Sequence, residues 1–235
     1  MRKPGRCSRR TCCPLRTHDE PGRTAGPGAV IVVGLTGGMG MGKSTAAGVF
    51  RRAGIAVFDA DAAVHALQRR GGGAVAAIAS LFPGTVRDGA VDRDLLRARV
   101  VGDEDALLHL ESVLHPLVRH EECRFVACAR RARRSMVVLD VPLLLESGGQ
   151  ARVDLVVVVS APASVQRVRA RRRGRMGEAQ IDAVLARQMP DAAKRRLADV
   201  VVHTGLSRAH AGRPLRRLIV RLRQAPRRAP QCKKG

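Results

Sequence analysis

Residues 30–45 read Val-Ile-Val-Val-Gly-Leu-Thr-Gly-Gly-Met-Gly-Met-Gly-Lys-Ser-Thr. The run begins with apolar, β-branched residues, which predicts a buried strand. Gly37-x-x-x-x-Gly42-Lys43-Ser44 follows directly, and this is the spacing of a phosphate-binding loop between a strand and a helix. Glycines let backbone N–H groups turn towards a phosphate, and a helix expected over 43–53 adds the partial positive charge of its N-terminus. The segment therefore predicts an α/β fold that binds a nucleoside triphosphate.

Lys43 is the most specific residue of the loop, because the chain has five lysines among 43 basic residues and places one here. Lysine supplies a slim point charge, whereas arginine would bring a planar fork. We expect Lys43 to reach the β- and γ-phosphates and the Ser44 hydroxyl to ligate Mg²⁺. The residues predicted to bind the nucleotide are Gly38, Gly40, Met41, Gly42, Lys43, Ser44 and Thr45. The plainer alternative is a glycine-rich strand–helix turn without a ligand.

The composition favours one α/β domain with a subdomain and an aliphatic core. The chain has 235 residues, 45% of them hydrophobic, with four Phe and no Trp or Tyr. No apolar run approaches the roughly 18–20 residues that a bilayer span needs, so we expect no membrane segment. The six cysteines show no metal-ligand spacing, which favours a reduced, cytoplasmic setting. Cys123 and Cys128 fall in a predicted helix and are interpreted as small buried residues.

Most of the net charge of +23 lies near the chain ends. Residues 1–28 carry seven basic and two acidic groups, and residues 206–235 carry ten basic and no acidic groups. We interpret 1–28 as a disordered extension and 206–235 as a basic helix and tail. A basic tail can bind polyanions non-specifically, but we expect no specific nucleic acid and no membrane partner. If the chain is a kinase, deleting 206–235 should leave turnover intact, whereas salt-sensitive binding to polyanions should vanish.

Strand and helix signals alternate between residues 29 and 205, as a parallel sheet with crossovers requires. The segment between the second and third strands is too long for one crossover helix, and we interpret 62–130 as a helical subdomain. The expected strands are 30–34, 55–58, 136–139, 155–160 and 200–203, and the expected later helices are 163–172, 178–188, 191–198 and 206–223.

Two carboxylates, Asp59 and Asp61, directly follow the second strand. Ligands bind beyond the carboxyl ends of strands in open parallel sheets, so both lie at the edge that carries the phosphate loop. A carboxylate there can orient and deprotonate an attacking hydroxyl. The alternative is that one of them only caps a helix, since Asp is favoured before a helix start.

Five segments in register resemble the dephospho-CoA kinase family. They are 34–45, Asp59-Ala-Asp61, Leu114-His-Pro-Leu-Val118, Asp140-Val-Pro-Leu-Leu-Leu-Glu146 and Ala198-Asp-Val-Val-Val202, with Gln166, Arg169, Arg173 and Gln188 between the last two. The resemblance spans about residues 30–205. It implies a P-loop kinase-like three-layer fold with a helical CoA-binding subdomain (62–130) and a lid (161–195). It also implies transfer of the ATP γ-phosphoryl group to the ribose 3′-hydroxyl of dephospho-CoA, the last step of coenzyme A synthesis.

The resemblance also assigns roles to single residues. Asp61 is the predicted base, with Asp59 next, and Lys43 and the lid residue Arg173 complete the predicted catalytic set. Thr36 is expected to line the phosphates. Arg93 and His115 are expected to contact the substrate. For Arg93 the alternative is an exposed helix charge, and for His115 it is a helix-capping His-Pro turn.

Two departures from the family pattern bear on the nucleotide. Met41 replaces the usual small serine, and His203-Thr204 stands where the family commonly has Asp-Asn, at an edge expected near the adenine. Two other functions compete with this interpretation: a different small-metabolite or nucleotide P-loop kinase, and a non-enzymatic binding protein whose basic tails engage nucleic acid. The oligomeric state is left open.

Overall fold

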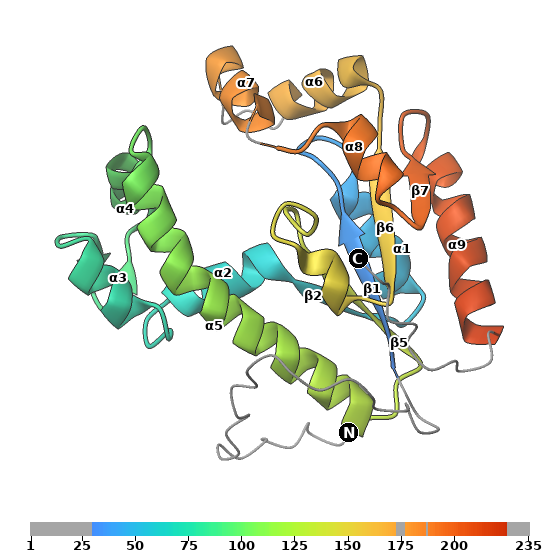
Figure 1. The fold of residues 1–235 in the computed structure, drawn as a ribbon, viewed down its shortest axis with the longest axis horizontal. Helices are drawn as coiled ribbons and strands as arrows, with labels where there is room; N and C mark the ends of the chain where they lie inside the picture. The colour runs from blue at the N-terminus through green and yellow to red at the C-terminus, as the bar shows by residue number, and fades with distance from the viewer. Residues whose placement is uncertain (1–29, 173–176, 187, 225–235) are drawn as a thin grey trace.

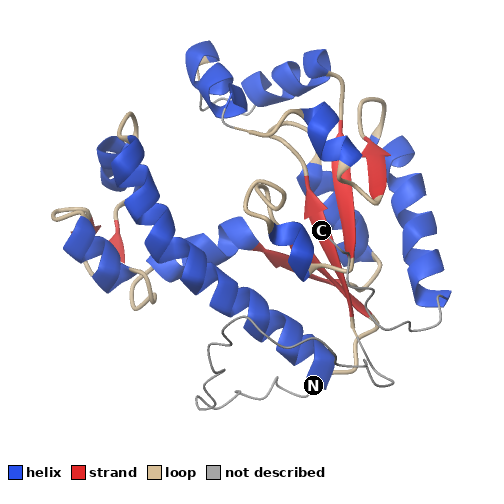
Figure 2. Cartoon of the chain, in the orientation of Figure 1, coloured by secondary structure: helices blue, strands red, loops and turns tan. Residues whose placement is uncertain are grey.

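The centre of the molecule is a five-stranded parallel sheet. The structure is a computed structural model that describes residues 30–172, 177–186 and 188–224. The strand order is β2-β5-β1-β6-β7, so β1 lies in the middle of the sheet (Figures 1 and 2). The strands are β1 (Ile31–Thr36), β2 (Ala56–Asp59), β5 (Met136–Asp140), β6 (Leu155–Ser160) and β7 (Val200–His203). The predicted parallel sheet is confirmed, and the expected strand bounds agree to within a few residues.

Helices cover both faces of this sheet, which gives the predicted three layers. On one face, α1 (Lys43–Arg52) and α9 (Arg208–Gln224) pack on side chains of β1, β5 and β6. On the other face lie the C-terminal half of α5 (Glu104–Arg131), the short 3₁₀ helix η1 (Gly149–Arg152) and α8 (Asp191–Arg196). The buried side chains are largely Val, Leu, Ile and Ala, so the core is aliphatic as expected.

A second, smaller core lies in the helical unit between β2 and β5. Its helices are α2 (Ala60–Gln68), α3 (Val75–Leu81), α4 (Arg93–Val100) and the N-terminal half of α5. Asp88 and Gly89 form the turn of a two-stranded ribbon of β3 (Val86–Arg87) and β4 (Ala90–Val91), which lies inside the segment predicted to be helical. Both turn residues have positive φ, 51° and 76°, which suits a tight hairpin turn.

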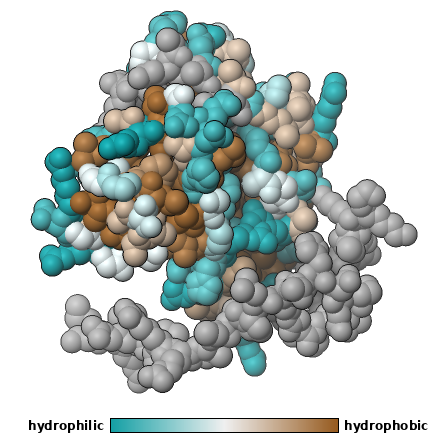
Figure 3. Space-filling model, turned by 60° about the vertical axis from the view of Figure 1, so that its left-hand side comes forward, coloured by the Kyte–Doolittle hydropathy of each residue, from teal (hydrophilic) through white to brown (hydrophobic). Residues whose placement is uncertain are grey.

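The helical unit also leaves apolar side chains exposed, namely Leu81, Val101 and Leu108. The space-filling view from the side of this unit shows brown surface among teal side chains (Figure 3). Single exposed apolar residues are ordinary. Three exposed apolar side chains on one small unit nevertheless suit a surface that contacts a partly apolar ligand.

Helices α6 (Ala163–Arg172) and α7 (Glu178–Ala186) project from the carboxyl end of the sheet as a pair (Figure 1). Ion pairs join them: Arg167 lies 2.8 Å from Asp182, and Arg171 pairs with Glu178. Two arginines of the predicted lid are therefore bound to α7. Arg173, the lid arginine predicted to be catalytic, lies outside the described residues, as do the predicted extension 1–28 and the chain after 224.

The helix expected within 206–235 is present as α9, and the structure adds that it is part of the main core. Its residues Ala211, Leu215 and Ile219 are buried in the cluster that also holds α1, and Leu215 is fully buried. Removal of 206–235 would uncover this cluster. Since the cluster also holds α1, we now expect the deletion to destabilise the fold and lower turnover, contrary to the expectation from the sequence.

The interpretation of the two cysteines of α5 as buried residues is also wrong. Cys123 and Cys128 are exposed. Only a narrow strip of this long helix faces the sheet, with Glu122 and Ala129 buried and Phe125 and Val126 partly buried. Within the described parts of the chain, no helix is both long and apolar enough to span a membrane.

Candidate active site

The phosphate loop joins β1 to α1, as the sequence predicts, and its backbone is shaped for an anion. Gly40 and Gly42 have φ values of 76° and 92°, a region that favours glycine. A Cβ at Gly40 would lie 2.7 Å from the carbonyl oxygen of Gln166. The N–H groups of Gly40, Gly42, Lys43 and Ser44 have no hydrogen-bond acceptor among the described residues. They are available to a phosphate at the N-terminus of α1.

The side chain of Met41 points from the phosphate loop into the main core. It is 4% exposed and belongs to the main core, and its Sδ accepts a hydrogen bond from Ala161 N at 3.1 Å. The bulk that distinguishes it from serine is thus placed in the core. Its backbone N–H donates to Gly38 O at 3.1 Å, so the group predicted to contact a phosphate has a partner within the loop.

Lys43 forms a largely buried ion pair with Asp140 at the carboxyl end of β5. The Nζ–Oδ1 distance is 2.7 Å, and the side chains are 16% and 5% exposed. Burial raises the pKa of the Asp140 carboxyl above its ordinary value, and the charge of Lys43 opposes that shift. Asp140 thus holds Lys43 at the mouth of the loop.

The two carboxylates after β2 have different surroundings. Asp59 is the last residue of β2 and the N-cap of α2, where it accepts a hydrogen bond from Ala62 N at 3.0 Å. It also lies 3.5 Å from Arg51 of α1 and is paired in register with Asp140. Asp61 is exposed in the first turn of α2 and has no hydrogen bond or ion pair within the described part of the chain.

The remaining predicted residues lie apart. Thr36 is fully buried, and its hydroxyl donates to Pro142 O at 2.8 Å, so its proton is committed to the chain. Ser44 is exposed and Thr45 is partly buried in the first turn of α1. Arg93 begins α4 and His115 lies in the middle of α5, both exposed on the helical unit. Because α5 continues through Pro116, the His-Pro pair does not cap a helix.

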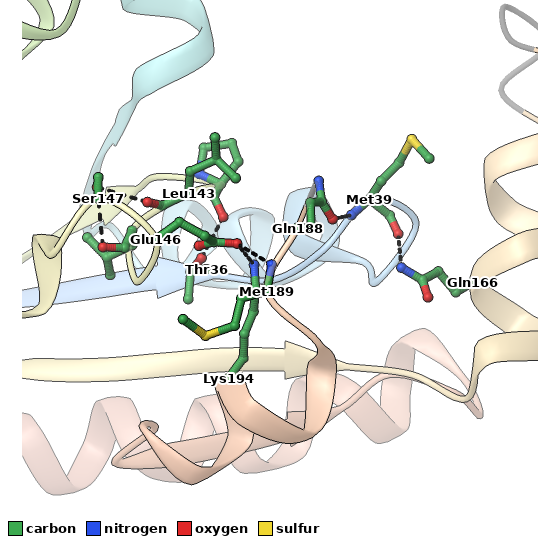
Figure 4. A network of polar contacts seen from close by, with 11 residues as sticks. Thr36, Met39, Leu143, Glu146, Ser147, Gln166, Gln188, Met189 and Lys194 are labelled. Atoms are coloured by element: carbon green, nitrogen blue, oxygen red, sulfur yellow. Dashed lines mark hydrogen bonds and ion pairs between the residues drawn. The ribbon is translucent and has the colours of Figure 1, made fainter. Parts of the chain in front are cut away.

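Five residues that were not predicted as site residues bind the loop or the segment that follows α7. Gln166 and Gln188 bond to the backbone of Met39, and Thr204 bonds to the carbonyl of Met41 (Figure 4 shows the two glutamines). Glu146 accepts from Met189 N at 3.1 Å and pairs with the buried Lys194 at 2.6 Å (Figure 4). The sequence signalled Gln166, Gln188 and Glu146 only as matches to the family pattern. Thr204 was treated as a departure near the adenine, and the structure places it, 4% exposed, against the loop.

The fold and the loop together define a P-loop phosphotransferase, and comparison with known proteins narrows the class. A family model described as dephospho-CoA kinase matches residues 31–208. A dephospho-CoA kinase from Paramagnetospirillum magneticum is 59% identical over 164 residues, 70% of this chain and 77% of that protein. One from Rhodospirillum rubrum is 50% identical, covering 84% of this chain and 94% of that protein. The structure of dephospho-CoA kinase from Campylobacter jejuni has a TM-score of 0.58 at 18% identity, covering 81% and 96% of the two chains, and supports the fold.

The chain belongs to the dephospho-CoA kinase family. It is an ATP-dependent kinase of coenzyme A biosynthesis, as the resemblance predicted, and the non-enzymatic alternative is set aside.

Proposed function

We propose that this chain transfers the γ-phosphoryl group of ATP to the ribose 3′-hydroxyl of dephospho-CoA, with Asp61 as the base. The observation that carries the proposal is the position of Asp61. It follows β2 at the same sheet edge as the phosphate loop, and it is the carboxylate there that has no partner within the described residues. Asp59 is bound to the start of α2 and to Arg51, so it is less available to a substrate.

The nucleotide side requires little rearrangement. The free N–H groups of the loop would donate hydrogen bonds to the phosphates, and Lys43 would exchange Asp140 for a phosphate oxygen. Because the pair with Asp140 is short and largely buried, Lys43 is held near the loop before ATP arrives. The electrostatic stabilisation is therefore in place at the start of the reaction.

Mg²⁺ would be held by the Ser44 hydroxyl together with phosphate oxygens. No group of three His, Cys, Asp or Glu side chains suitable for a metal occurs within 30–172, 177–186 and 188–224. The exposed Ser44 in the first turn of α1 fits a cation that arrives with the nucleotide. When bound, Mg²⁺ offsets negative charge on the phosphates.

Asp61 would accept the proton of the ribose 3′-hydroxyl while the hydroxyl oxygen forms a bond to the γ-phosphorus. The bond between the γ-phosphorus and the oxygen that bridges it to the β-phosphate breaks at the same time, and ADP leaves with that oxygen. The helical unit would hold the rest of the acceptor. Arg93 and His115 supply exposed polar contacts on α4 and α5, and the exposed apolar residues of the same unit suit the less polar arm of the substrate. Arg173 in the predicted lid would stabilise the transferring group.

A cytoplasmic setting is part of the same proposal. It is supported by the free thiols of Cys123 and Cys128, since disulfides persist in oxidising compartments.

The test is ADP release from Mg-ATP with and without dephospho-CoA, for the wild-type chain and for Asp61→Asn and Asp59→Asn. We expect turnover to depend on dephospho-CoA. The Asp61 variant should lose about 10²–10⁴-fold in kcat, the usual range for a general base. The Asp59 variant should lose less. Equal losses in the two variants would contradict the choice of Asp61, and ADP release indifferent to dephospho-CoA would favour another acceptor.

A further inference from the structure

We propose that Gln166 and Gln188 are positioning residues that transmit the position of the α6–α7 pair to the phosphate loop through the backbone of Met39. The proposal rests on the ATP-binding role of the loop and goes beyond it. Gln166 lies near the start of α6, and Gln188 follows the end of α7. The two glutamines thus stand at the two ends of the α6–α7 segment, and both reach the same residue of the loop.

The contacts are complementary and close. Gln188 Oε1 accepts a hydrogen bond from Met39 N at 3.1 Å, and Gln166 Nε2 donates to Met39 O at 2.8 Å (Figure 4). Both amides lie over Gly38, where an added Cβ would be 3.0 Å from Gln188 Oε1 and 3.3 Å from Gln166 Nε2. Gln166 is 9% exposed, so its amide is largely shielded from competing water. The glycine leaves the space that these two amides fill.

Helix α6 has a second connection to the loop, made by Arg169 in its last turn. The Arg169 guanidinium donates to Thr204 O at 2.6 Å and to Thr204 Oγ1 at 3.2 Å. The Thr204 hydroxyl in turn donates to Met41 O. A movement of α6 would therefore displace the backbone at Met39 and at Met41, on either side of Gly40.

The end of α7 is fastened to the sheet edge as well. Directly after Gln188, Met189 N donates to Glu146 Oε1, and the same carboxylate pairs with Lys194, which is 1% exposed. This fixes the segment 189–194, so displacement of α7 acts on the short link at Gln188. Such contiguous contacts carry coupling only if the α6–α7 pair has two positions, which is what a lid requires.

The direction of each hydrogen bond makes the proposal testable by a two-by-two set of variants. Glutamate is nearly isosteric with glutamine, but its carboxylate only accepts hydrogen bonds. Gln188→Glu therefore keeps the acceptor that Met39 N requires. Gln166→Glu places a carboxylate oxygen against Met39 O, which is also an acceptor. Gln188→Met and Gln166→Met remove the polar contact at each position without adding charge.

We expect both methionine variants to raise the fraction of ATP hydrolysed without phosphorylation of dephospho-CoA and to lower kcat by about tenfold, the scale of one well-placed hydrogen bond. Gln188→Glu should restore most of this loss relative to Gln188→Met. Gln166→Glu should restore none relative to Gln166→Met. The KM for dephospho-CoA should change little in any variant. Gln150→Glu, an exposed position on η1, controls for the added negative charge.

A merely structural role would lower the melting temperature of the variants and leave the division of ATP between transfer and hydrolysis unchanged, and that result would overturn the proposal. Equal behaviour of the two glutamate variants would overturn it too, because charge alone would then explain both. If Gln166 variants fail to fold, the comparison at the partly buried Gln188 still decides. The affinity for a fluorescent ATP analogue, measured for the same variants, tests this proposal independently of the acceptor. A changed affinity in the glutamine variants would support a role at the loop even if the wild-type chain did not phosphorylate dephospho-CoA.

Discussion

The two substrate sides of this kinase are built differently. On the nucleotide side, the side chains around the phosphate loop already have partners: Lys43 with Asp140, Gln166 and Gln188 with Met39, and Thr204 with Met41. On the acceptor side, Asp61, Arg93 and His115 are exposed and have no hydrogen bond or ion pair within the described chain.

This difference indicates which groups are ready before substrate arrives. Groups fixed in advance lose little freedom on binding and can stabilise charge without rearrangement. Exposed side chains without partners must be ordered by the substrate, at the cost of part of the binding energy. Variants on the nucleotide side should therefore change the chemical step. Variants of Arg93 and His115 on the acceptor side should change mainly the affinity for dephospho-CoA, and Asp61, the proposed base, is the exception on that side.

Apart from the proposed base Asp61, the largest effect is expected for Lys43→Met, which removes the charge and keeps most of the bulk. We expect kcat/KM for ATP to fall about 10²–10³-fold, as when one pre-positioned donor of a transition-state charge is lost. Arg52→Met, an exposed cation at the end of the same helix, serves as the matched control and should stay close to wild type. A loss of the same size in the Arg52 variant would mean that general charge, not the pre-positioned lysine, matters.

Leu215→Ala tests whether the nucleotide side rests on α9. Leu215 is fully buried in the cluster that holds α1, so the substitution should lower the free energy of unfolding by about 2–5 kcal/mol, measured by urea denaturation. Val220→Ala, half-exposed on the same helix, should change it by roughly 0.5 kcal/mol or less. If the Leu215 variant were as stable as the Val220 variant, α9 would contribute little to the stability of the fold. The packing of α9 on α1 would then not help to hold the phosphate loop.

The sequence revealed the nucleotide side well because its signal is contiguous. A strand, a glycine-rich loop and Lys43 stand within sixteen residues, and the backbone alone makes most of the site. The contacts that hold the loop are long-range: Gln188 is 149 positions from Met39, and Thr204 is 163 positions from Met41. A glutamine or threonine has no local pattern that announces such a partner.

The errors have a similar origin. The arginine-rich composition of 206–235 concealed an apolar stripe of one residue every four, Ala211, Leu215 and Ile219, which packs on α1. Cys123 and Cys128 were assigned to the interior by residue type, although the face of α5 that meets the sheet decides burial. The short β3–β4 ribbon was hidden because its strands have only two residues each.

The acceptor side is tested by Arg93→Ala and His115→Ala. We expect the KM for dephospho-CoA to rise by about tenfold for Arg93, the scale of one charge-assisted hydrogen bond, and by a few-fold for His115. The KM for ATP should not change. Arg97→Ala, exposed on the same helix as Arg93, is the control. An equal rise in both KM values would show that the acceptor side and the nucleotide side are not separate.

The smallest effect concerns the pH dependence of stability through Asp140, on the nucleotide side. Because burial raises the folded-state pKa of this carboxyl above its ordinary 3.8, the folded chain retains the proton to a higher pH than the unfolded chain does. Asp140 therefore contributes stability that is fully present below pH 3.8 and is lost as the pH rises through the folded pKa. In Asp140→Asn this loss is absent, so the stability of the variant relative to wild type should increase with pH across that window and then level off.

Urea denaturation of the nucleotide-free protein at a series of pH values measures the difference, with Asp94→Asn on the exposed surface of α4 as the control. A relative stability that falls with pH would mean that the attraction of Lys43 for the Asp140 carboxylate outweighs the effect of burial. The Lys43–Asp140 pair would then oppose the transfer of Lys43 to a phosphate.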